Sequence, residues 1–99
     1  MIRSQRVSKE LFQAIEEGDL KAIQSLIEQG VDIHARNEFE STPLHYACGN
    51  EHLEVVKLLV EKGADVNARN KIRLAPLHYA CRNRHLEIID YLKSKGAKE

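Results

Sequence analysis

The feature that most constrains this fold is an internal repeat with a period of 33 residues. When the chain is shifted by 33 positions, residues 38–66 fall on 71–99, and 14 of the 29 aligned pairs are identical. A second shift of 33 brings the N-terminal third into the same register with fewer matches. A fixed period of this length is typical of proteins in which each unit stacks on its neighbours. The chain therefore divides into three units within one domain spanning 1–99, namely about 9–37, 38–70 and 71–99.

The middle unit predicts two short helices. Thr42 before Pro43 predicts a helix start, because threonine favours the N-cap and proline suits the first helical position. This helix is expected to end near Gly49–Glu51. A second helix is expected to begin around His52–Leu53, with the histidine fixing its start, and to end at Lys62–Gly63 with a left-handed glycine. Helices this short are marginal alone in water, so they must be held by stacking.

These features resemble the ankyrin repeat family. The signature Thr-Pro-Leu-His-x-Ala stands at 42–47 and returns at 75–80 with alanine in place of threonine. The second-helix and loop patterns of the family stand at 52–59 and 63–68. The resemblance covers roughly residues 9–99 and implies an all-α solenoid of helix–turn–helix units joined by β-turn loops. It also implies a module that binds other proteins.

The chain departs from the family pattern at its turns and at one cap. Four positions where the family usually has glycine carry larger residues, namely Glu40, Glu51, Arg73 and Arg84. If they need positive φ, each costs on the order of 1 kcal/mol relative to glycine. Ala75 lacks the hydroxyl that Thr42 offers as a cap, a loss of about 0.5–2 kcal/mol. We therefore predict that the third unit is less stable than the second.

The first and last units are predicted to be caps, which replace an apolar outer face with a polar one. The first unit lacks the Pro-Leu-His signature and carries Gln13, Glu16 and Glu17 on its first helix. In the last unit, Lys93 stands where the middle unit has Val60. A complete, capped array, or a deliberately bounded segment, is therefore expected.

Two His-x-x-Cys pairs are the candidate chemical groups, at His45 with Cys48 and at His78 with Cys81. The resemblance implies that these histidines hydrogen-bond across the loops of adjacent units; the alternative is a free ionisable base. Stacked equivalents should lie about 10 Å apart, too far for one zinc ion or for a disulfide between the two units. Both cysteines are expected to fill a small apolar slot.

Motifs and bulk composition exclude several classes of function. The chain has no nucleophile elbow, phosphate-binding glycine loop or zinc-protease motif, so we expect no enzyme, no cofactor and no metal site. Basic and acidic residues number 15 each, which argues against electrostatic binding to nucleic acid or an anionic membrane. No apolar run reaches membrane-spanning length, and two cysteines are too few for a disulfide scaffold. An intracellular, most simply cytoplasmic, protein is expected.

The resemblance implies a concave binding surface formed by the turn tips and the exposed side of the first helices. Phe39, Ile72 and Leu74 are unusual for solvated turn tips, so they either pack tip on tip or anchor a partner. Tyr46 and Tyr79 either contact the partner or are partly buried between helices. The predicted partner-binding residues are Arg36, Glu38, Phe39, Ser41, Tyr46, Arg69, Lys71, Ile72, Leu74, Tyr79 and Arg82.

Charge is unevenly distributed along the chain. Residues 1–68 hold 7 basic and 12 acidic side chains, a net −5, whereas residues 69–99 hold 8 basic and 3 acidic side chains, a net +5. We predict that the C-terminal part attracts an acidic, partly apolar segment of another protein, because charge steers association. A monomer is expected. The alternatives are a minimal or engineered stacking scaffold without its own partner, head-to-tail self-association, and, least favoured, nucleic-acid binding through the arginine cluster, which lacks interleaved aromatic residues.

Overall fold

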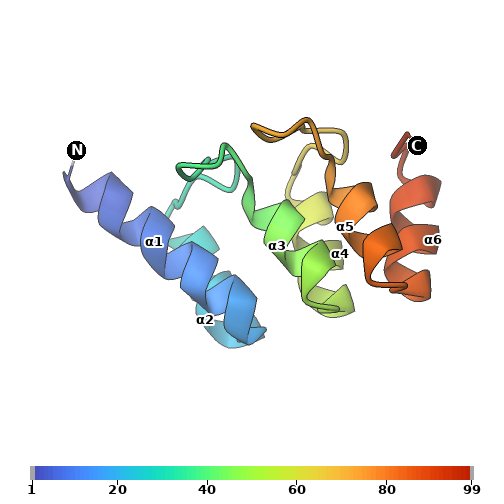
Figure 1. The fold of residues 1–99 in the computed structure, drawn as a ribbon. Coiled ribbons are helices and arrows are strands. Elements are labelled where there is room, and N and C mark those ends of the chain that lie inside the picture. The colour runs from blue at the N-terminus through green and yellow to red at the C-terminus, as the bar shows by residue number, and fades with distance from the viewer. Residues whose placement is uncertain (1, 99) are drawn as a thin grey trace.

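The fold is a stack of three helical pairs, seen in a computed structural model that describes the chain path of residues 2–98 and the side chains of residues 8–98 (Figure 1). The first helices of the pairs form one layer and the second helices form the other, with the two ends of the chain at opposite ends of the stack. The molecule measures 36 × 27 × 20 Å. Within residues 2–98 the helices are α1 (Ile2–Glu17), α2 (Leu20–Glu28), α3 (Pro43–Gly49), α4 (Leu53–Glu61), α5 (Pro76–Arg82) and α6 (Leu86–Ser94).

The middle pair confirms the two helices predicted from the sequence. Thr42 is extended, with φ −96° and ψ 167°, and α3 begins at the proline that follows it. Gly63 ends the pair with φ 99°, and its N–H donates to the Val60 carbonyl at 3.0 Å. A left-handed residue at this point lets the chain leave α4 while the last carbonyls of the helix keep partners.

Within residues 2–98, four residues other than glycine adopt the left-handed conformation, and all four stand where the family usually has glycine. The φ angles are 58° at Glu40, 57° at Glu51, 65° at Arg73 and 57° at Arg84. Two of these residues close the turns at the loop tips, because the N–H of Glu40 donates to the Asn37 carbonyl at 2.9 Å and the third unit repeats the bond. Each position holds strain of about 1 kcal/mol that glycine would relieve.

One apolar core runs through the whole stack. Each unit contributes leucine or isoleucine at equivalent positions, so the core residues of neighbouring units meet between the two helix layers. The largest side chains with almost no exposure are Leu11, Ile15, Ile23, Leu44, Leu59, Leu77, Ile88 and Leu92. This continuity explains how helices of 7 to 9 residues are held.

The two ends of the stack differ from each other. At the N-terminal end, α1 is 16 residues long and extends beyond the stack (Figure 1). At the C-terminal end, the prediction that both cysteines fill an apolar slot is wrong for Cys81, which is exposed, whereas Cys48 is fully buried. The reason is that α5 covers the cysteine of α3, while α5 itself belongs to the last pair. The predicted polar cap is also incomplete, since Leu86 is 70% exposed.

Candidate protein-interaction surface

An asparagine in each loop fixes the turn that carries an exposed apolar side chain. Asn37 Oδ1 accepts the N–H of Phe39 at 2.9 Å, and Asn70 Oδ1 accepts the N–H of Ile72 at 3.1 Å. The two tips therefore share one backbone conformation. The side chain at the first tip, Phe39, is 59% exposed, and the side chain at the second tip, Ile72, is 68% exposed.

The two tyrosines of the first helices are bonded to the same asparagines. The side-chain amide of Asn37 donates to the hydroxyl of Tyr46, and that of Asn70 donates to the hydroxyl of Tyr79 at 2.8 Å. The Tyr46 ring also packs edge-on against Phe12, with ring centroids 5.4 Å apart. Both tyrosines are half-buried, so each ring stands between the helix layer and the loops with one side accessible.

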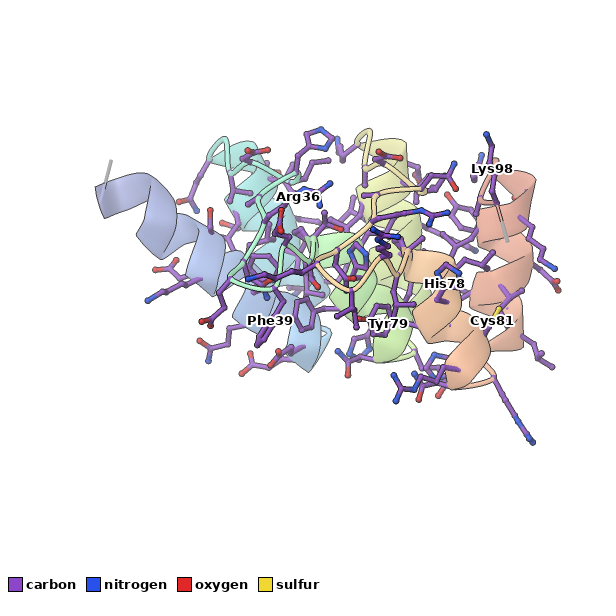
Figure 2. All side chains as sticks on the ribbon, turned by 45° about the horizontal axis from the view of Figure 1, so that its top comes forward. Arg36, Phe39, His78, Tyr79, Cys81 and Lys98 are labelled. Carbon is purple, nitrogen blue, oxygen red and sulfur yellow. The ribbon has the colours of Figure 1, made fainter. Side chains whose placement is uncertain are left out.

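A groove of about 350 Å³ lies between the loop tips and the first helices of the second and third units. Phe39 and Ile72 face this shared space from the tips, and Tyr46 and Tyr79 face it from the helices. Figure 2 shows Phe39 and Tyr79 on the same side of the molecule. The full lining is Phe39, Ser41, His45, Tyr46, Gly49, Asn50, Asn70, Lys71, Ile72, Tyr79 and Asn83.

The structure brings together six of the eleven residues predicted to bind a partner. These line the groove, namely Phe39, Ser41, Tyr46, Lys71, Ile72 and Tyr79. Arg36 and Glu38 instead line a neighbouring hollow towards α1, which shares Tyr46 with the groove. Three more of the predicted residues line neither space, namely Arg69, Leu74 and Arg82.

Two of the residues predicted to bind a partner make hydrogen bonds that stabilise the fold, namely Ser41 and Arg36. Ser41 is buried, and its hydroxyl accepts from the Asn70 amide at 3.1 Å. Arg36 donates through Nη1 to the carbonyl of Glu40 at 2.9 Å and to that of Arg69 at 2.7 Å, which ties the first tip to the second. Part of the expected binding set therefore connects neighbouring loops.

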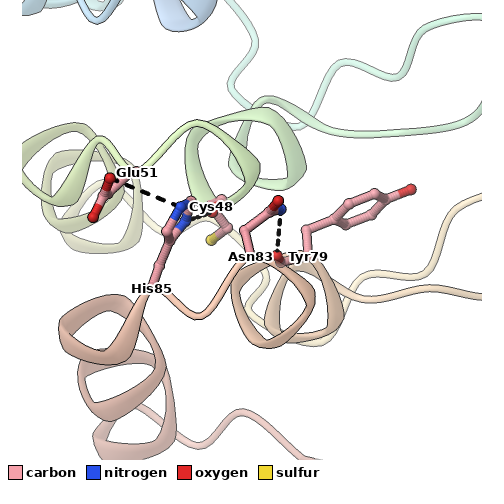
Figure 3. A network of polar contacts seen from close by, with 5 residues as sticks. All are labelled: Cys48, Glu51, Tyr79, Asn83 and His85. Carbon is pink, nitrogen blue, oxygen red and sulfur yellow. Dashed lines mark hydrogen bonds and ion pairs between the residues drawn. The ribbon is translucent and has the colours of Figure 1, made fainter.

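Sequence reasoning missed two asparagines at the groove, Asn50 and Asn83. Each follows the end of a first helix, and its amide donates back to the carbonyl of Tyr46 or Tyr79 at 2.9 Å. Figure 3 shows this bond for Asn83 and Tyr79. The sequence signal that could have found them is their identity across the 33-residue shift, whereas their exposure is visible only in the structure. They add polar amide groups to an otherwise largely apolar floor.

His45 makes the hydrogen bond across loops that the family resemblance implied. Its Nδ1 accepts the N–H of Thr42 at 3.0 Å, so the other ring nitrogen carries the proton and donates to the Leu74 carbonyl at 2.8 Å. Burial lowers the pKa of His45 below its ordinary value, although the bond to Leu74 acts in the opposite direction. The neutral ring is therefore the form built into the loop contact. In the last unit, Nδ1 of His78 accepts the N–H of Ala75 at 2.8 Å.

The histidines before the second helices bridge successive units. A ring nitrogen of His52 lies 3.1 Å from the Glu16 carbonyl, and one of His85 lies 2.9 Å from the Cys48 carbonyl. The other nitrogen of His85 lies 3.9 Å from the Glu51 carboxylate (Figure 3). Both histidines stand at the N-cap positions of the second helices, but their side chains make no capping hydrogen bond there and instead join each unit to the one before it.

Within residues 2–98 there is no group of three or more histidine, cysteine, aspartate or glutamate side chains placed to hold a metal ion. In that same range no helix combines the length and the apolar character needed to cross a bilayer.

Stacked helical pairs joined by projecting turns define a solenoid repeat protein. The family described as Ankyrin repeats (3 copies) matches residues 11–99, so this chain belongs to the ankyrin repeat family. Two curated relatives are similar to part of the chain, the human and mouse Protein phosphatase 1 regulatory subunit 27. Each is 42% identical over 40 residues, which is 40% of this chain and 26% of the relative. The chain thus matches about a quarter of the length of these relatives.

Proposed function

We propose that this chain is a non-enzymatic interaction module that binds another protein in the groove between its second and third units. The observation that carries the proposal is the placement of Phe39 and Ile72. Both are large apolar side chains, 59% and 68% exposed, and both are held by asparagine-fixed turns over the same groove. Rigid apolar anchors lower the entropic cost of binding, and such anchors commonly supply most of the affinity.

The partner that fits this surface is an acidic, partly apolar segment. Lys71 lines the groove, and residues 69–99 carry a net +5, whereas the lining of the hollow towards α1 balances Lys9 and Arg36 against Glu16 and Glu38. An acidic segment is therefore attracted to the third-unit side of the groove. Its apolar residue would enter between Phe39 and Ile72.

A groove of this size supports modest affinity that depends on few contacts. We propose that the chain acts as a monomer inside the cell, most simply in the cytoplasm. The two cysteines support the location because both are free thiols, as is usual in a reducing compartment. The match to the phosphatase regulatory subunits covers little more than one 33-residue unit, so it supports the family and does not identify a phosphatase as the partner.

The test is the double variant Phe39→Ala, Ile72→Ala in affinity capture followed by mass spectrometry. We expect the specific partner to be lost while helical circular dichroism is retained, because both side chains are mostly exposed. Lys21→Ala is the control, since Lys21 is an exposed residue of α2 that lies outside the groove. Capture that survives the double variant would contradict the groove assignment, and the absence of any specific partner would favour a scaffold role.

A further inference from the structure

The groove carries two side-chain amides held in the same geometry. Asn50 and Asn83 are the C-cap residues of α3 and α5, with φ −105° and ψ 11° at the first and φ −99° and ψ 6° at the second. Each amide nitrogen donates to the main-chain carbonyl of a tyrosine four residues earlier at 2.9 Å, and Figure 3 shows this bond for Asn83. The bond fixes the orientation of the amide. A ligand in the groove therefore meets the same group twice, once in each unit.

Each of these amides keeps a donor and an acceptor for a ligand. Only the nitrogen can donate to a carbonyl, so the bond back to the helix uses one N–H and leaves the second N–H and the amide oxygen. Within the residues whose side chains the structure describes, neither amide makes a further hydrogen bond. Asn50 and Asn83 are both exposed, and both line the groove. A donor and an acceptor offered together match the C=O and N–H of a polypeptide main chain.

The residue before Asn50 leaves space for a close approach. Gly49 is the last residue of α3 and lines the groove, yet its φ is not positive. A Cβ built on it would make an ordinary contact, 3.8 Å from the Cβ of Tyr79, and α5 has Arg82 at the equivalent position. The fold therefore does not require glycine here, and glycine in a helix is destabilising relative to alanine. What the missing side chain provides is room for another main chain beside the Asn50 amide.

The spacing of the two amides favours one conformation of the ligand. Helices α3 and α5 pack together, and packed helices lie about 10 Å apart. Three residues of a polyproline II helix advance about 9 Å and return to the same side of its axis, because this helix has three residues per turn. Its N–H and C=O groups have no internal partners. An α-helix uses these groups within itself and would offer none to the asparagines.

We infer that the groove binds an extended segment of the partner protein through its main chain, with peptide groups three residues apart bonded to Asn50 and Asn83. This inference rests on the proposed function and specifies how the same groove is filled. The segment passes over Gly49, and its apolar side chains contact the two loop tips. Among the residues that line the groove there is one cation, Lys71, and no carboxylate, so acidic side chains fit beside the bonded main chain.

The probe is a short acidic peptide from a phage-displayed random library, selected on the full chain and counter-selected on the Phe39→Ala, Ile72→Ala double variant. Each main-chain nitrogen of the peptide is then methylated in turn, which removes one N–H donor at a time. We expect methylation at two positions three residues apart to raise the Kd at least about tenfold, because each removes a hydrogen bond to an asparagine. Isothermal titration calorimetry measures the Kd of every pair.

Variants of the asparagines assign each bond. Asn50→Ala should abolish the effect of methylation at one of the two positions only, and Asn83→Ala at the other, because a bond already absent cannot be lost again. A purely structural role of either residue would weaken all peptides alike. Asn67→Ala is the matched control, since its amide bonds to the Gly96 carbonyl outside the groove, and it should leave the affinity unchanged.

Gly49→Ala separates binding from folding. The Kd for the unmodified peptide should rise at least about tenfold because the methyl group occupies the space of the ligand main chain, whereas the urea midpoint should rise because alanine favours the helix. Methylation losses at another spacing, losses that persist in both asparagine variants, or an unchanged Kd in Gly49→Ala would each overturn this inference and leave the proposed function intact. A library without any peptide that requires Phe39 and Ile72 would contradict the proposed function, and the inference with it.

Discussion

The second and third units share Pro-Leu-His-Tyr-Ala-Cys on their first helices, yet the identical residues lie in different environments. Cys48 is fully buried and Cys81 is exposed, and His45 is buried where His78 is half-buried. The backbones agree closely, with Thr42 at φ −96° and Ala75 at φ −95°. The difference shows that sequence sets the shape of a unit in this stack, whereas the neighbouring unit sets how deeply each side chain is buried.

The strongest test of this difference in burial places the same charged residue at each of the two cysteine positions. Cys48→Arg should lower the free energy of unfolding by about 4 kcal/mol or more, because it forces a cation into the core. Cys81→Arg should change that free energy by less than about 0.5 kcal/mol, since the side chain points to solvent. Urea denaturation of both variants measures the difference. Equal losses would show that the two faces are equally covered.

Replacing the equivalent histidines should give a smaller difference in unfolding free energy between the two units. His45→Leu should cost about 2 kcal/mol, because the Thr42 N–H and the Leu74 carbonyl both lose a partner in or near the core. His78→Leu should cost about 1 kcal/mol, given its one bond to the Ala75 N–H. Thermal denaturation at pH 7.5 compares them. A larger loss at His78 would contradict the hydrogen-bond pattern.

The pH dependence gives a control for the His45 variant. Burial, supported by Arg36 and His78, lowers the pKa of His45 below 6.5. As the pH falls below 6.5, the unfolded chain therefore takes up a proton that the folded chain resists, and stability decreases. Above that value, both states are neutral and this contribution is complete. His45→Leu should flatten the acid side of the stability profile, whereas an unchanged profile would assign the slope to other groups.

Glycine at the strained turns should affect the two units alike. Glu40→Gly and Arg73→Gly should each raise the free energy of unfolding by about 1 kcal/mol, since their φ angles are 58° and 65°. Glu38→Gly, in the same loop without a positive φ, should give no gain. Denaturation midpoints test all three. A gain at one turn only would mean that one side chain compensates its strain through a contact.

The smallest expected effect concerns the residue before α5. Ala75→Thr should stabilise the chain by about 0.5–1 kcal/mol, because in the second unit the Thr42 hydroxyl lies 2.9 Å from Nδ1 of His45. This change should reduce the difference in stability between the second and third units, because most of the stabilisation falls in the third unit. Amide hydrogen exchange, read separately for α3 and α5, tests that distribution. A gain in α3 alone would contradict the local role.

The sequence predicted most of the architecture because its signals are local. The Thr-Pro start of α3 and the end at Gly63 depend on backbone preferences that a single unit carries. The positive φ angles at Glu40 and Arg73 run against the preferences of these residues, and only the family pattern of glycine pointed to them. The candidate site was predicted only in part, because burial depends on what packs nearby. Ser41 was expected at a binding surface but is covered by the next loop, and the identity of Cys48 and Cys81 suggested an equal environment that the end of the stack does not provide.

The units are joined largely through main-chain oxygen atoms. The carbonyls of Glu16, Phe39, Cys48, Arg69 and Leu74 each accept a bond from another unit. Because every amino acid supplies a carbonyl, substitutions at Phe39 or Arg69 leave these acceptors in place. Mutation can therefore alter the residues at the tips, where we propose that a partner binds, without dismantling the array. Under that proposal, the chain can change its partner at little structural cost.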